Sequence, residues 1–560
     1  MEKHLFALQV SHLLGEAFSR EWIYEQIEIP KKESMGDLSF PCFSLAKTLR
    51  KNPASIAVDL ASHIDHEIFS EVKATGGYVN AFLNQSFITS HTLKQVLTAG
   101  RRYGEHDIGK GKTVVLDLSS PNIAKPFSMG HLRSTVIGQA ISHLAEKCGY
   151  KTVKINYIGD YGTQFGKLLA AYHKWGDPEK IQKDPIKELT KIYVQFHEAS
   201  KQDPGLIEEG REWFKKLEEN DETALELWRW FKDASLKEFD KIYELLNISF
   251  DLVRGEAYYN DKMEKTITEI MKKGILEESE GAQVVRLDEE GLPPCLIRKS
   301  NGTTTYATRD ITSAIDRYDS FAFDESLYVV GHEQTLHFQQ IKHVLQKMGY
   351  SWADHIHHVP FGMMLKEGKK MSTRQGKTIL LEEVLQEAID HAKQNIELKN
   401  PDLPDKQKVA KQVGVGAVIF HDLKHDRKND VEFSLEQMLT FEGNTAPYLQ
   451  YTYARATSIL RRAQFDPDQA TDQLEDSHAW TAIKLIRRFP EVIEDAYQNY
   501  DPSRVARYLL DLAKSFNQYY AATKIIGNSQ EQAHLTFIYT LTTVLQEGLS
   551  LLGIETPDEM

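Results

Sequence analysis

The order of hydrophobic and polar positions divides the chain into three stretches of different periodicity. Residues 1 to about 105 combine an amphipathic helical pattern, "NPASIAVDLASHI", with strand-like runs such as "YVNAFLN". From about 106 to 400 the pattern alternates strand, turn and helix, and from about 401 to 560 it is almost entirely helical. We therefore predict three domains, 1–105, 106–400 and 401–560, with the polar segment Gly100–Lys112 as a linker between the first two.

The central stretch has the pattern of a parallel sheet. "TVVLDLSS" is β-branched and apolar, as a buried parallel strand is, and "KTVKINYIGD" predicts a second strand. Between them lies a helix that ends near Gly149, with one apolar stripe formed by Leu132, Val136, Ile137, Ala140, Ile141, Leu144, Ala145 and Cys148. Further strands are predicted at "ISFDLVRG", "SLYVVGHE" and "HIHHVPFGMML". A charged, tryptophan-containing stretch at 167–246 predicts a helical insertion into this α/β domain.

The last stretch has the pattern of a packed helical bundle. In "SRVARYLLDLAKSFNQYY" an apolar face contains Val505, Leu509, Leu512, Phe516 and Tyr520. Its charge is mixed, which is typical of a folded domain and not of a charged tail. The fold class that follows is multidomain α/β, with an α+β N-terminal domain and an all-α C-terminal bundle.

Composition and charge narrow the class of protein. Hydrophobic residues make up 41% of the 560 residues and the net charge is −14, which excludes a protein that coats nucleic acid nonspecifically. Cys42, Cys148 and Cys295 are isolated, so neither a zinc ribbon nor a disulfide framework is expected. No apolar run is long enough to span a bilayer, and the first residues lack the pattern of a secretory leader. We expect a cytoplasmic protein without a membrane partner.

The segment "SSPNIAKPFSMGHLRS" joins the first predicted strand to its helix. A helix N-terminus at the carboxyl end of a parallel strand favours phosphate, and Gly130 allows a ligand to approach the backbone closely. His131 can donate to a phosphate oxygen, and Lys125 adds a mobile cation. The alternative is a structural turn whose histidine caps the helix, which a bare Gly-His pair favours.

The whole string is more specific than the Gly-His pair. It resembles the "HIGH" signature of class I aminoacyl-tRNA synthetases in the form found in arginyl-tRNA synthetases, and Ser128 replaces the first histidine of that signature. The resemblance implies a Rossmann-like catalytic domain that binds ATP through Ser128, Gly130 and His131.

A second motif, Lys370-Met371-Ser372-Thr373-Arg374, resembles the mobile "KMSKS" loop of the same class. By itself such a run is most often a solvated surface loop. In the family, its lysine swings onto the triphosphate as pyrophosphate leaves. Arg374 takes the place of the usual second lysine, and Lys125 is thought to compensate for that lysine. The resemblance implies that Lys125, His131 and Lys370 are catalytic and that Met371, Ser372 and Arg374 help to bind ATP.

The residues of "TTYATRDITSAI" suggest how a guanidinium is bound. Tyr306 and Asp310 lie four positions apart, on one face if the segment is helical, and a carboxylate can accept two N–H bonds from arginine. An ordinary amphipathic surface helix has the same spacing. The family resemblance implies an arginine site formed by Asp117, Ser120, Asn122, Tyr306, Asp310 and Gln334, with Asp160 and Gln164 near its rim.

The resemblance extends to both ends of the chain and implies contacts with tRNA. Tyr78 and Asn80 match an aromatic-x-Asn pair that reads a D-loop base, although a strand packed on a sheet is an equally good explanation. The C-terminal helices resemble an anticodon-binding bundle with interleaved aromatic and cationic residues. The residues implied in tRNA binding are Tyr78, Asn80, Tyr451, Arg455, Tyr520 and Met560; Glu559 stands where the family commonly has arginine.

These expectations combine into one function. The resemblance implies a monomeric enzyme that joins L-arginine to tRNA(Arg) through an arginyl-adenylate, with Mg²⁺ carried by ATP and no dedicated metal ligands in the protein. One alternative is a catalytically weakened paralogue that binds tRNA or arginine as a regulator, which Ser128 and Glu559 favour. Another is a nucleotidyltransferase with a smaller substrate, which should lack the long C-terminal helical region.

Overall fold

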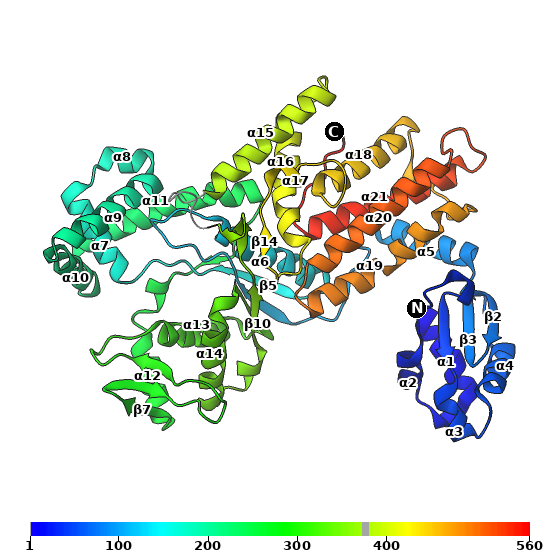
Figure 1. Ribbon diagram of the computed structural model, residues 1–560, viewed down its shortest axis with the longest axis horizontal. Helices are drawn as coiled ribbons and strands as arrows, with labels where there is room; N and C mark the ends of the chain where they lie inside the picture. Colours follow the sequence, from blue (N-terminus) through cyan, green and yellow to red (C-terminus); the bar gives the residue numbers. More distant parts are fainter. Residues whose placement is uncertain (1, 372–379) are drawn as a thin grey trace. The chain divides into compact units, whose positions relative to one another are not determined.

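The computed structural model describes residues 2–371 and 380–560 (Figure 1). The chain forms two compact units. One consists of Met1–Tyr103, Ile459–Arg487 and Lys514–Thr543, and the other of Gly104–Ser458, Arg488–Ala513 and Val544–Met560. The candidate site described below lies entirely in the second unit.

The N-terminal region is an α+β fold, as predicted. Its three strands form an antiparallel sheet in the order β1-β3-β2, and β2 and β3 are joined by a tight turn at Gly76, whose φ is +58°. Asn52 caps α4 by accepting a hydrogen bond from the Ala54 N–H. The elements are α1 (Glu2–Leu14), α2 (Arg20–Gln26), β1 (Leu38–Pro41), α3 (Ala46–Leu49), α4 (Pro53–His63), β2 (Phe69–Thr75), β3 (Tyr78–Leu83) and α5 (Gln85–Ala99).

The segment between this region and the central sheet is anchored. The Tyr103 side chain is buried and its hydroxyl donates to the Ile486 carbonyl at 3.2 Å. The residue four positions after Ile486 is Pro490, which lies inside the same helix and has no N–H to donate to that carbonyl. The Ile486 carbonyl is therefore free to accept from Tyr103, and this hydrogen bond fixes the predicted linker at Tyr103.

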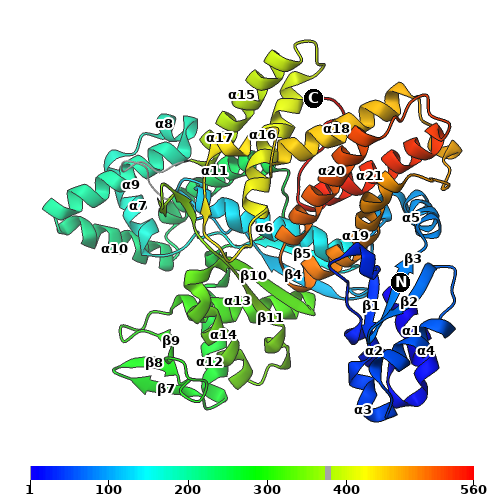
Figure 2. The same ribbon diagram turned by 45° about the vertical axis from the view of Figure 1, so that its right-hand side comes forward.

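The central sheet has five parallel strands in the order β11-β10-β4-β5-β6, as Figure 2 shows for four of them. The predicted β-α-β unit is confirmed, and the helix ends just before Gly149, whose φ is +89°. Because β5 and β10 flank β4 on opposite sides, the chain changes direction across the sheet at the carboxyl end of β4. Open α/β sheets bind ligands at such a point. The elements are β4 (Thr113–Asp117), α6 (Met129–Lys147), β5 (Lys151–Asn156), β6 (Leu252–Val253), α13 (Tyr306–Phe321), β10 (Glu325–Gly331), α14 (Thr335–Lys347) and β11 (Ile356–Phe361).

Helices cover both faces of this sheet. Gly138 on α6 lies so close to Leu118 that a Cβ there would be 2.5 Å from the leucine side chain, so a larger residue would push α6 away. On the other face, Val115, Val153 and Ile155 belong to a hydrophobic core that also contains residues of α13 and α14. The strands are apolar on both faces because both are buried.

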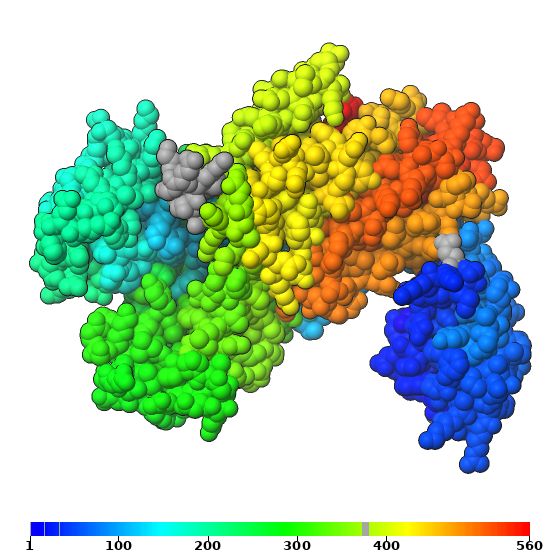
Figure 3. Space-filling model, in the orientation of Figure 1, coloured from blue at the N-terminus to red at the C-terminus, as the bar shows by residue number. Residues whose placement is uncertain are grey.

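The predicted helical insertion is confirmed. Its helices are α7 (Thr163–Trp175), α8 (Pro178–Lys183), α9 (Pro185–Gln202), α10 (Gly205–Glu218) and α11 (Glu222–Leu246), and Figure 3 shows them gathered in one region of the surface. Before α13 the chain adds the 3-10 turn η5 (Glu256–Tyr259), α12 (Met263–Lys272) and a small antiparallel sheet of β7 (Leu276–Ser279), β8 (Ala282–Val285) and β9 (Cys295–Arg298).

The remaining elements are mainly helical, as predicted. After β11 a small sheet joins β12 (Met364–Lys366), β13 (Lys369–Lys370) and β14 (Val431–Glu432). The helices are α15 (Leu381–Lys399), α16 (Lys406–Leu423), α17 (Leu435–Met438), α18 (Ala446–Arg462), α19 (Trp480–Gln498), α20 (Ser503–Ala522) and α21 (Glu531–Leu551). Helix α20 buries Val505, Leu509, Leu512 and Phe516, but Tyr520 is 42% exposed. Tyr520 shares the predicted apolar stripe but not its burial, because the buried face continues through Tyr519, which is fully buried.

Candidate active site

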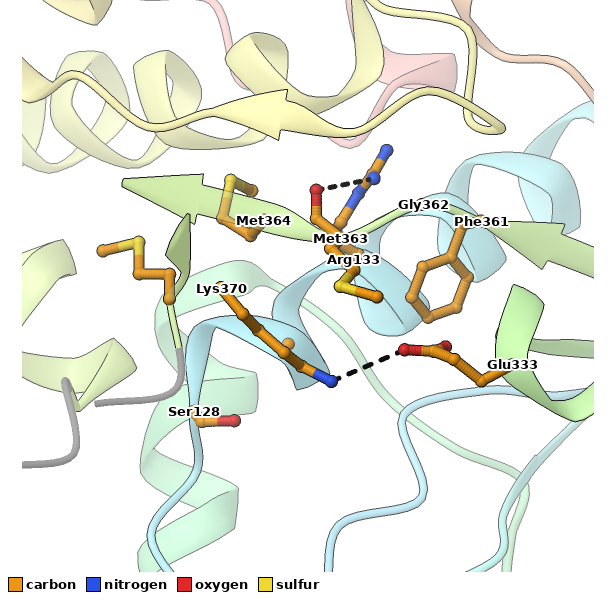
Figure 4. A pocket seen from close by; sticks show the side chains of 10 residues that line it. Ser128, Arg133, Glu333, Phe361, Gly362, Met363, Met364 and Lys370 are labelled. Atoms are coloured by element: carbon orange, nitrogen blue, oxygen red, sulfur yellow. Dashed lines mark hydrogen bonds and ion pairs between the residues drawn. The ribbon is translucent and has the colours of Figure 1, made fainter. Parts of the chain in front are cut away.

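A pocket of about 170 Å³ lies at the N-terminus of α6 (Figure 4). It brings together the two motifs that are far apart in the sequence, since Ser128 and Gly130 line it with Lys370 and Met371. The other lining residues are Arg133, Glu333, Phe361, Gly362, Met363 and Met364. Its walls therefore come from α6, from the end of β11 and from the hairpin of β12 and β13.

His131 has a fixed orientation at the start of α6. Its Nδ1 accepts a hydrogen bond from the Ser128 backbone N–H at 3.0 Å, and the Ser128 hydroxyl lies 3.2 Å from the same nitrogen. The ring hydrogen of the neutral imidazole is therefore on Nε2. Burial and the charge of Lys125 lower the pKa of His131 to about 4, so at neutral pH it is an uncharged donor. His131 therefore fits both interpretations, as a helix cap through Nδ1 and as a hydrogen-bond donor to phosphate through its Nε2–H.

The loop between β4 and α6 has an unusual backbone. Ser119, Ser120 and Ala124 have φ values of +74°, +53° and +56°, a region that non-glycine residues rarely adopt. Helix α11 of the insertion holds this loop in place: the Ser235 hydroxyl accepts from the Ala124 N–H at 2.9 Å, and the Tyr243 hydroxyl lies 2.8 Å from that of Ser119. The insertion thus supports the backbone that carries the first motif.

Lys370 lies at the mouth of the pocket, where its ammonium is 3.5 Å from a carboxylate oxygen of Glu333 (Figure 4). Met371 is buried, and its N–H donates to the Met364 carbonyl at 2.8 Å. Leu380 pairs with Ser128 as an isolated β-bridge. The chain on both sides of the second motif is therefore attached to the pocket walls. Ser372 and Arg374 lie outside the described residues.

Arg133, one turn along α6, joins the pocket to α16 and the chain that follows it. Its guanidinium is fully buried, with Nε 2.7 Å from a carboxylate oxygen of Asp422. It also donates to the carbonyls of Asn429, at 2.9 Å, and Met363, at 3.5 Å. A buried ion pair with backbone acceptors on both sides fixes the distance between α6 and the Gly362–Met363 wall.

A second cluster lies around Asp310 on α13. The Tyr157 hydroxyl donates to Oδ1 of Asp310 at 3.1 Å, and Nε2 of His337 lies 2.6 Å from Oδ2. Burial and then the Asp310 charge raise the pKa of Tyr157 well above its usual value, so the phenol stays protonated and donates. Tyr306, one turn earlier on α13, is 67% exposed. Gln334 ends the 3-10 turn η6 (His332–Gln334) and is exposed.

Asp117, at the end of β4, is buried in an ion pair. Oδ2 accepts from the Arg317 guanidinium at 2.6 Å and Oδ1 from the Ser120 hydroxyl at 2.9 Å. Asn122 packs on the backbone of Gly159, where a Cβ would be 2.2 Å from the amide oxygen. Asp117 thus orients Ser120, and both of its oxygens already have donors.

Asp160, which was expected near the rim of the arginine site with Gln164, is fully buried. Its carboxylate accepts from the Lys232 ammonium at 2.7 Å and from the Ala257 N–H at 2.8 Å. Gln164 is half-buried in the first turn of α7. The Asp160 contacts tie the chain after β5 to α11 and to η5.

Two titratable groups, Glu256 and Lys125, interact electrostatically between the first motif and the Asp310 cluster. Glu256, at the start of η5, is mostly buried and lies 3.9 Å from the Arg309 guanidinium. Burial raises the pKa of Glu256 to about 7; Arg309 opposes this shift, and the Asp310 and Asp160 charges add to it. Burial lowers the pKa of Lys125, and the Glu256 charge opposes that shift. Glu256 therefore interacts electrostatically both with Lys125, in the first motif, and with Asp310, in the second cluster.

The residues expected to contact tRNA have different environments. Tyr78 is half-buried with Phe43 against its ring edge, but Asn80 is fully buried and its amide oxygen accepts from the Ser39 hydroxyl at 2.6 Å. Tyr451 on α18 is 40% exposed, with the Arg455 guanidinium 4.7 Å from its ring centre. The Met560 carbonyl accepts from the Asn400 amide at 3.3 Å.

Sequence reasoning missed three polar residues that face these clusters: Glu256, Glu333 and His337. Each follows the carboxyl end of a parallel strand, Glu256 after β6 and the other two after β10. Because ligands bind at that edge of an α/β sheet, a search for polar residues just after each predicted strand would have found them.

Two negative findings apply to the described ranges 2–371 and 380–560. No helix there is long and apolar enough to cross a membrane. Within the same ranges, no group of three or more histidine, cysteine, aspartate or glutamate side chains could hold a metal ion.

A parallel sheet with a Gly-His turn at the point where strand order reverses, facing a lysine motif across one pocket, defines a class I aminoacyl-tRNA synthetase. The family model "tRNA synthetases class I (R), catalytic domain" matches residues 92–435. The models "Arginyl tRNA synthetase N terminal domain" and "DALR anticodon binding domain" match residues 5–83 and 449–560. The chain belongs to the arginyl-tRNA synthetase family.

Individual proteins are similar over the whole length. "Arginine--tRNA ligase 2" of Bacillus anthracis is 56% identical over 559 residues, covering 100% of both chains. An "Arginine--tRNA ligase" of Streptococcus pneumoniae is 51% identical over 561 residues, again covering 100% of each. The solved arginyl-tRNA synthetase of Thermus thermophilus has 26% identity and a TM-score of 0.81, with 100% of each chain covered.

Proposed function

We propose that this chain joins L-arginine to tRNA(Arg) at the expense of ATP, as the names of its relatives say of those proteins. One observation carries the proposal: the α6 N-terminus and the lysine motif line one pocket although about 240 residues separate them in the chain. Two distant cationic and N–H-rich segments that meet in one pocket are what a triphosphate needs.

ATP binds with its phosphates at the α6 N-terminus. Gly130 leaves the backbone N–H groups accessible, and Nε2 of neutral His131 donates to a phosphate oxygen. Lys370 supplies positive charge from the pocket lining and Lys125 from the loop before α6, and Met371 holds the base of the lysine loop against the pocket wall. Ser128 contributes through the orientation of His131. Ser372 and Arg374 complete the phosphate contacts, and Mg²⁺ arrives bound to ATP.

Arginine binds beside this pocket. Asp310 accepts the guanidinium, Tyr306 and Gln334 cover it, and Glu256 adds a second carboxylate. Ser120 and Asn122 bind the α-amino and α-carboxylate groups, with Ser120 oriented by Asp117. This arrangement places the substrate carboxylate at the carboxyl end of β4, next to the phosphate site.

The reaction then needs no covalent bond to the protein. An oxygen of the arginine carboxylate attacks the α-phosphorus of ATP in line, the bond to the bridging oxygen breaks, and pyrophosphate leaves with that electron pair. Lys370 and Lys125 stabilise the charge that develops on the leaving group. The 2′-hydroxyl of the terminal tRNA nucleotide then attacks the adenylate carbonyl, releases AMP and loses its proton.

The two ends of the chain bind tRNA. Residues 1–105 contact the tRNA elbow, with Tyr78 stacking on a loop base and Asn80 fixing the strand from inside. Residues 401–560 bind the anticodon region, with Tyr451, Arg455 and Tyr520 offering exposed rings and a cation, and Met560 closing the C-terminal end. The catalytic chemistry belongs to residues 106–400.

The alternatives have little support. Ser128 takes part in the histidine-capping contact, so its presence does not require a loss of activity. The C-terminal helical region that a smaller nucleotidyltransferase would lack is present and matches an anticodon-binding model. We propose action as a monomer in the cytoplasm; the three cysteines are free and buried, which supports a reducing setting.

The test is ATP–pyrophosphate exchange with arginine, run with and without tRNA, followed by charging of total tRNA with labelled arginine. Arginine-dependent exchange and charging are expected. Tight tRNA binding without charging would instead establish the regulator, and exchange that needs neither arginine nor RNA would establish the other nucleotidyltransferase.

A further inference from the structure

The carboxylate of Asp310 is held by donors from two other elements. Tyr157, directly after β5, reaches Oδ1 with its hydroxyl at 3.1 Å, and His337 on α14 reaches Oδ2 with Nε2 at 2.6 Å. Helices α13 and α14 lie side by side, as Figure 1 shows, so His337 reaches Asp310 directly from its own helix. The two donors act on different oxygens, so together they fix the rotation of the carboxylate plane.

The chemistry of a carboxylate explains what this leaves for a ligand. An ionised carboxylate only accepts, so Nε2 of His337 carries the hydrogen of that bond. Each oxygen has about two acceptor directions, and each donor takes one of them. One acceptor direction per oxygen remains, which suits the two parallel N–H groups of a guanidinium.

The His337 ring is itself held in place. It packs edge-on against Phe338, with ring centres 5.4 Å apart, and Phe338 stacks on His358 at 4.9 Å. The Asp310 and His337 side chains are 20% and 23% exposed, so water competes only partly for their hydrogen bond. The His337 imidazole is therefore held rigidly enough to orient the Asp310 carboxylate.

We infer that His337 and Tyr157 are positioning residues for arginine: they clamp the Asp310 carboxylate so that its two free acceptor directions face the guanidinium. This inference rests on the arginine pocket proposed above. Neither residue contacts the substrate. Their effect passes through Asp310 alone, so it concerns arginine binding and not ATP binding.

The decisive comparison uses two variants at one position. His337→Leu removes the donor, whereas His337→Gln keeps an N–H close to the place of Nε2. Because a hydrogen bond to a charged acceptor is worth more than a neutral one, His337→Leu is expected to raise the arginine KM about tenfold or more. His337→Gln should stay within about threefold of the unchanged enzyme, and in both the ATP KM should change by less than about twofold.

Two further variants keep the test independent of folding. Tyr157→Phe removes a single oxygen and should raise the arginine KM about fivefold with little effect on kcat. His343→Leu, the same substitution on the same helix, is the matched control and should leave the arginine KM unchanged. Thermal unfolding of each variant checks that it is folded.

The outcomes separate this inference from the proposed function. If the unchanged enzyme charges tRNA and His337→Leu and Tyr157→Phe keep its arginine KM, the clamp is wrong and the ligase stands. If the KM for ATP rises with that for arginine, or if His337→Gln is as impaired as His337→Leu, the residues act on the fold and the clamp is again wrong. If the unchanged enzyme shows no arginine-dependent exchange, the proposed function itself fails.

Discussion

The ammonium of Lys370 lies 3.5 Å from a carboxylate oxygen of Glu333 across the mouth of the pocket at the α6 N-terminus. Both side chains are about half exposed, at 61% and 45%, so the pair is weak and contributes little to stability. A backbone hydrogen bond and then the Lys370 charge lower the pKa of Glu333 against the opposing effect of burial, so the carboxylate stays ionised. A triphosphate carries more negative charge than the Glu333 carboxylate. A bound ATP can therefore attract the Lys370 ammonium away from Glu333.

Replacement of Lys370 tests its assigned role. Lys370→Ala should lower the rate of arginine-dependent pyrophosphate exchange by about 10²- to 10³-fold, since it removes a cation that stabilises the leaving pyrophosphate. Lys369→Ala is the matched control, because this neighbour is exposed and does not line the pocket. Equal losses in both variants would mean that the general charge of the hairpin, and not Lys370, assists the reaction.

Arginine binding should depend on pH through Glu256. Its pKa is raised to about 7 by burial, and a bound guanidinium favours the ionised form, so binding below pH 7 must release a proton. The arginine KM is expected to be about tenfold higher at pH 6 than at pH 8.

Glu256→Gln provides the control for this pH dependence. Its arginine KM should be higher overall but flat over the same range, because the amide does not titrate. The linked stability effect has the opposite direction. A buried acid with a raised pKa lowers the stability of the unchanged enzyme as pH rises from about 4.5 to 7. Glu256→Gln should therefore be more stable relative to the unchanged enzyme at about pH 8 than at about pH 4.5. A slope in KM that persists in the variant would assign the titration to another group.

The buried pair of Arg133 and Asp422 should be sensitive to the loss of either partner. Arg133→Met or Asp422→Leu leaves a buried charged group without its partner, which is expected to lower the free energy of unfolding by about 3–5 kcal/mol. The double variant Arg133→Met with Asp422→Leu should lose much less than the sum of the single losses. Chemical denaturation followed by tryptophan fluorescence measures all three, and additive losses would show that the pair is not coupled.

The N-terminal region offers a contrast between the half-buried ring of Tyr78 and the fully buried amide of Asn80. Tyr78→Ala should raise the tRNA KM about tenfold without changing the KM of ATP, because base stacking on an aromatic ring is worth about 1–3 kcal/mol. Asn80→Ala should mainly lower stability, since its buried amide bonds Ser39. Val58→Ala, at an exposed position on α4, is the surface control. A normal tRNA KM in Tyr78→Ala would remove this residue from the interface.

Much of the fold was predictable from local pattern. The strand–helix–strand unit, the helical insertion and the helical C-terminal region all follow from apolar spacing and the glycine after α6. Helical spacing alone did not decide between Tyr519 and Tyr520 at the end of the apolar stripe: Tyr519 is fully buried and Tyr520 is 42% exposed.

The candidate site was predictable only in part. The two signature motifs could be named from the sequence because their order along the chain is itself the signal, and their residues Ser128, Gly130, Lys370 and Met371 line one pocket. Asp117 was expected to meet the substrate directly, but its two oxygens bond Arg317 and Ser120. Arg317 is 200 residues away in the chain, and no local pattern indicates that such a partner arrives.

The sequence by itself determined which elements form and which residue types stand at the ends of the strands, because propensity, periodicity and motif order act over a few neighbouring residues. The tertiary structure decided which side chains meet: Lys370 with Glu333, Asp310 with Tyr157 and His337, and Arg133 with Asp422. These contacts depend on how strands and helices pack across the sheet, and packing is a property of the whole folded chain.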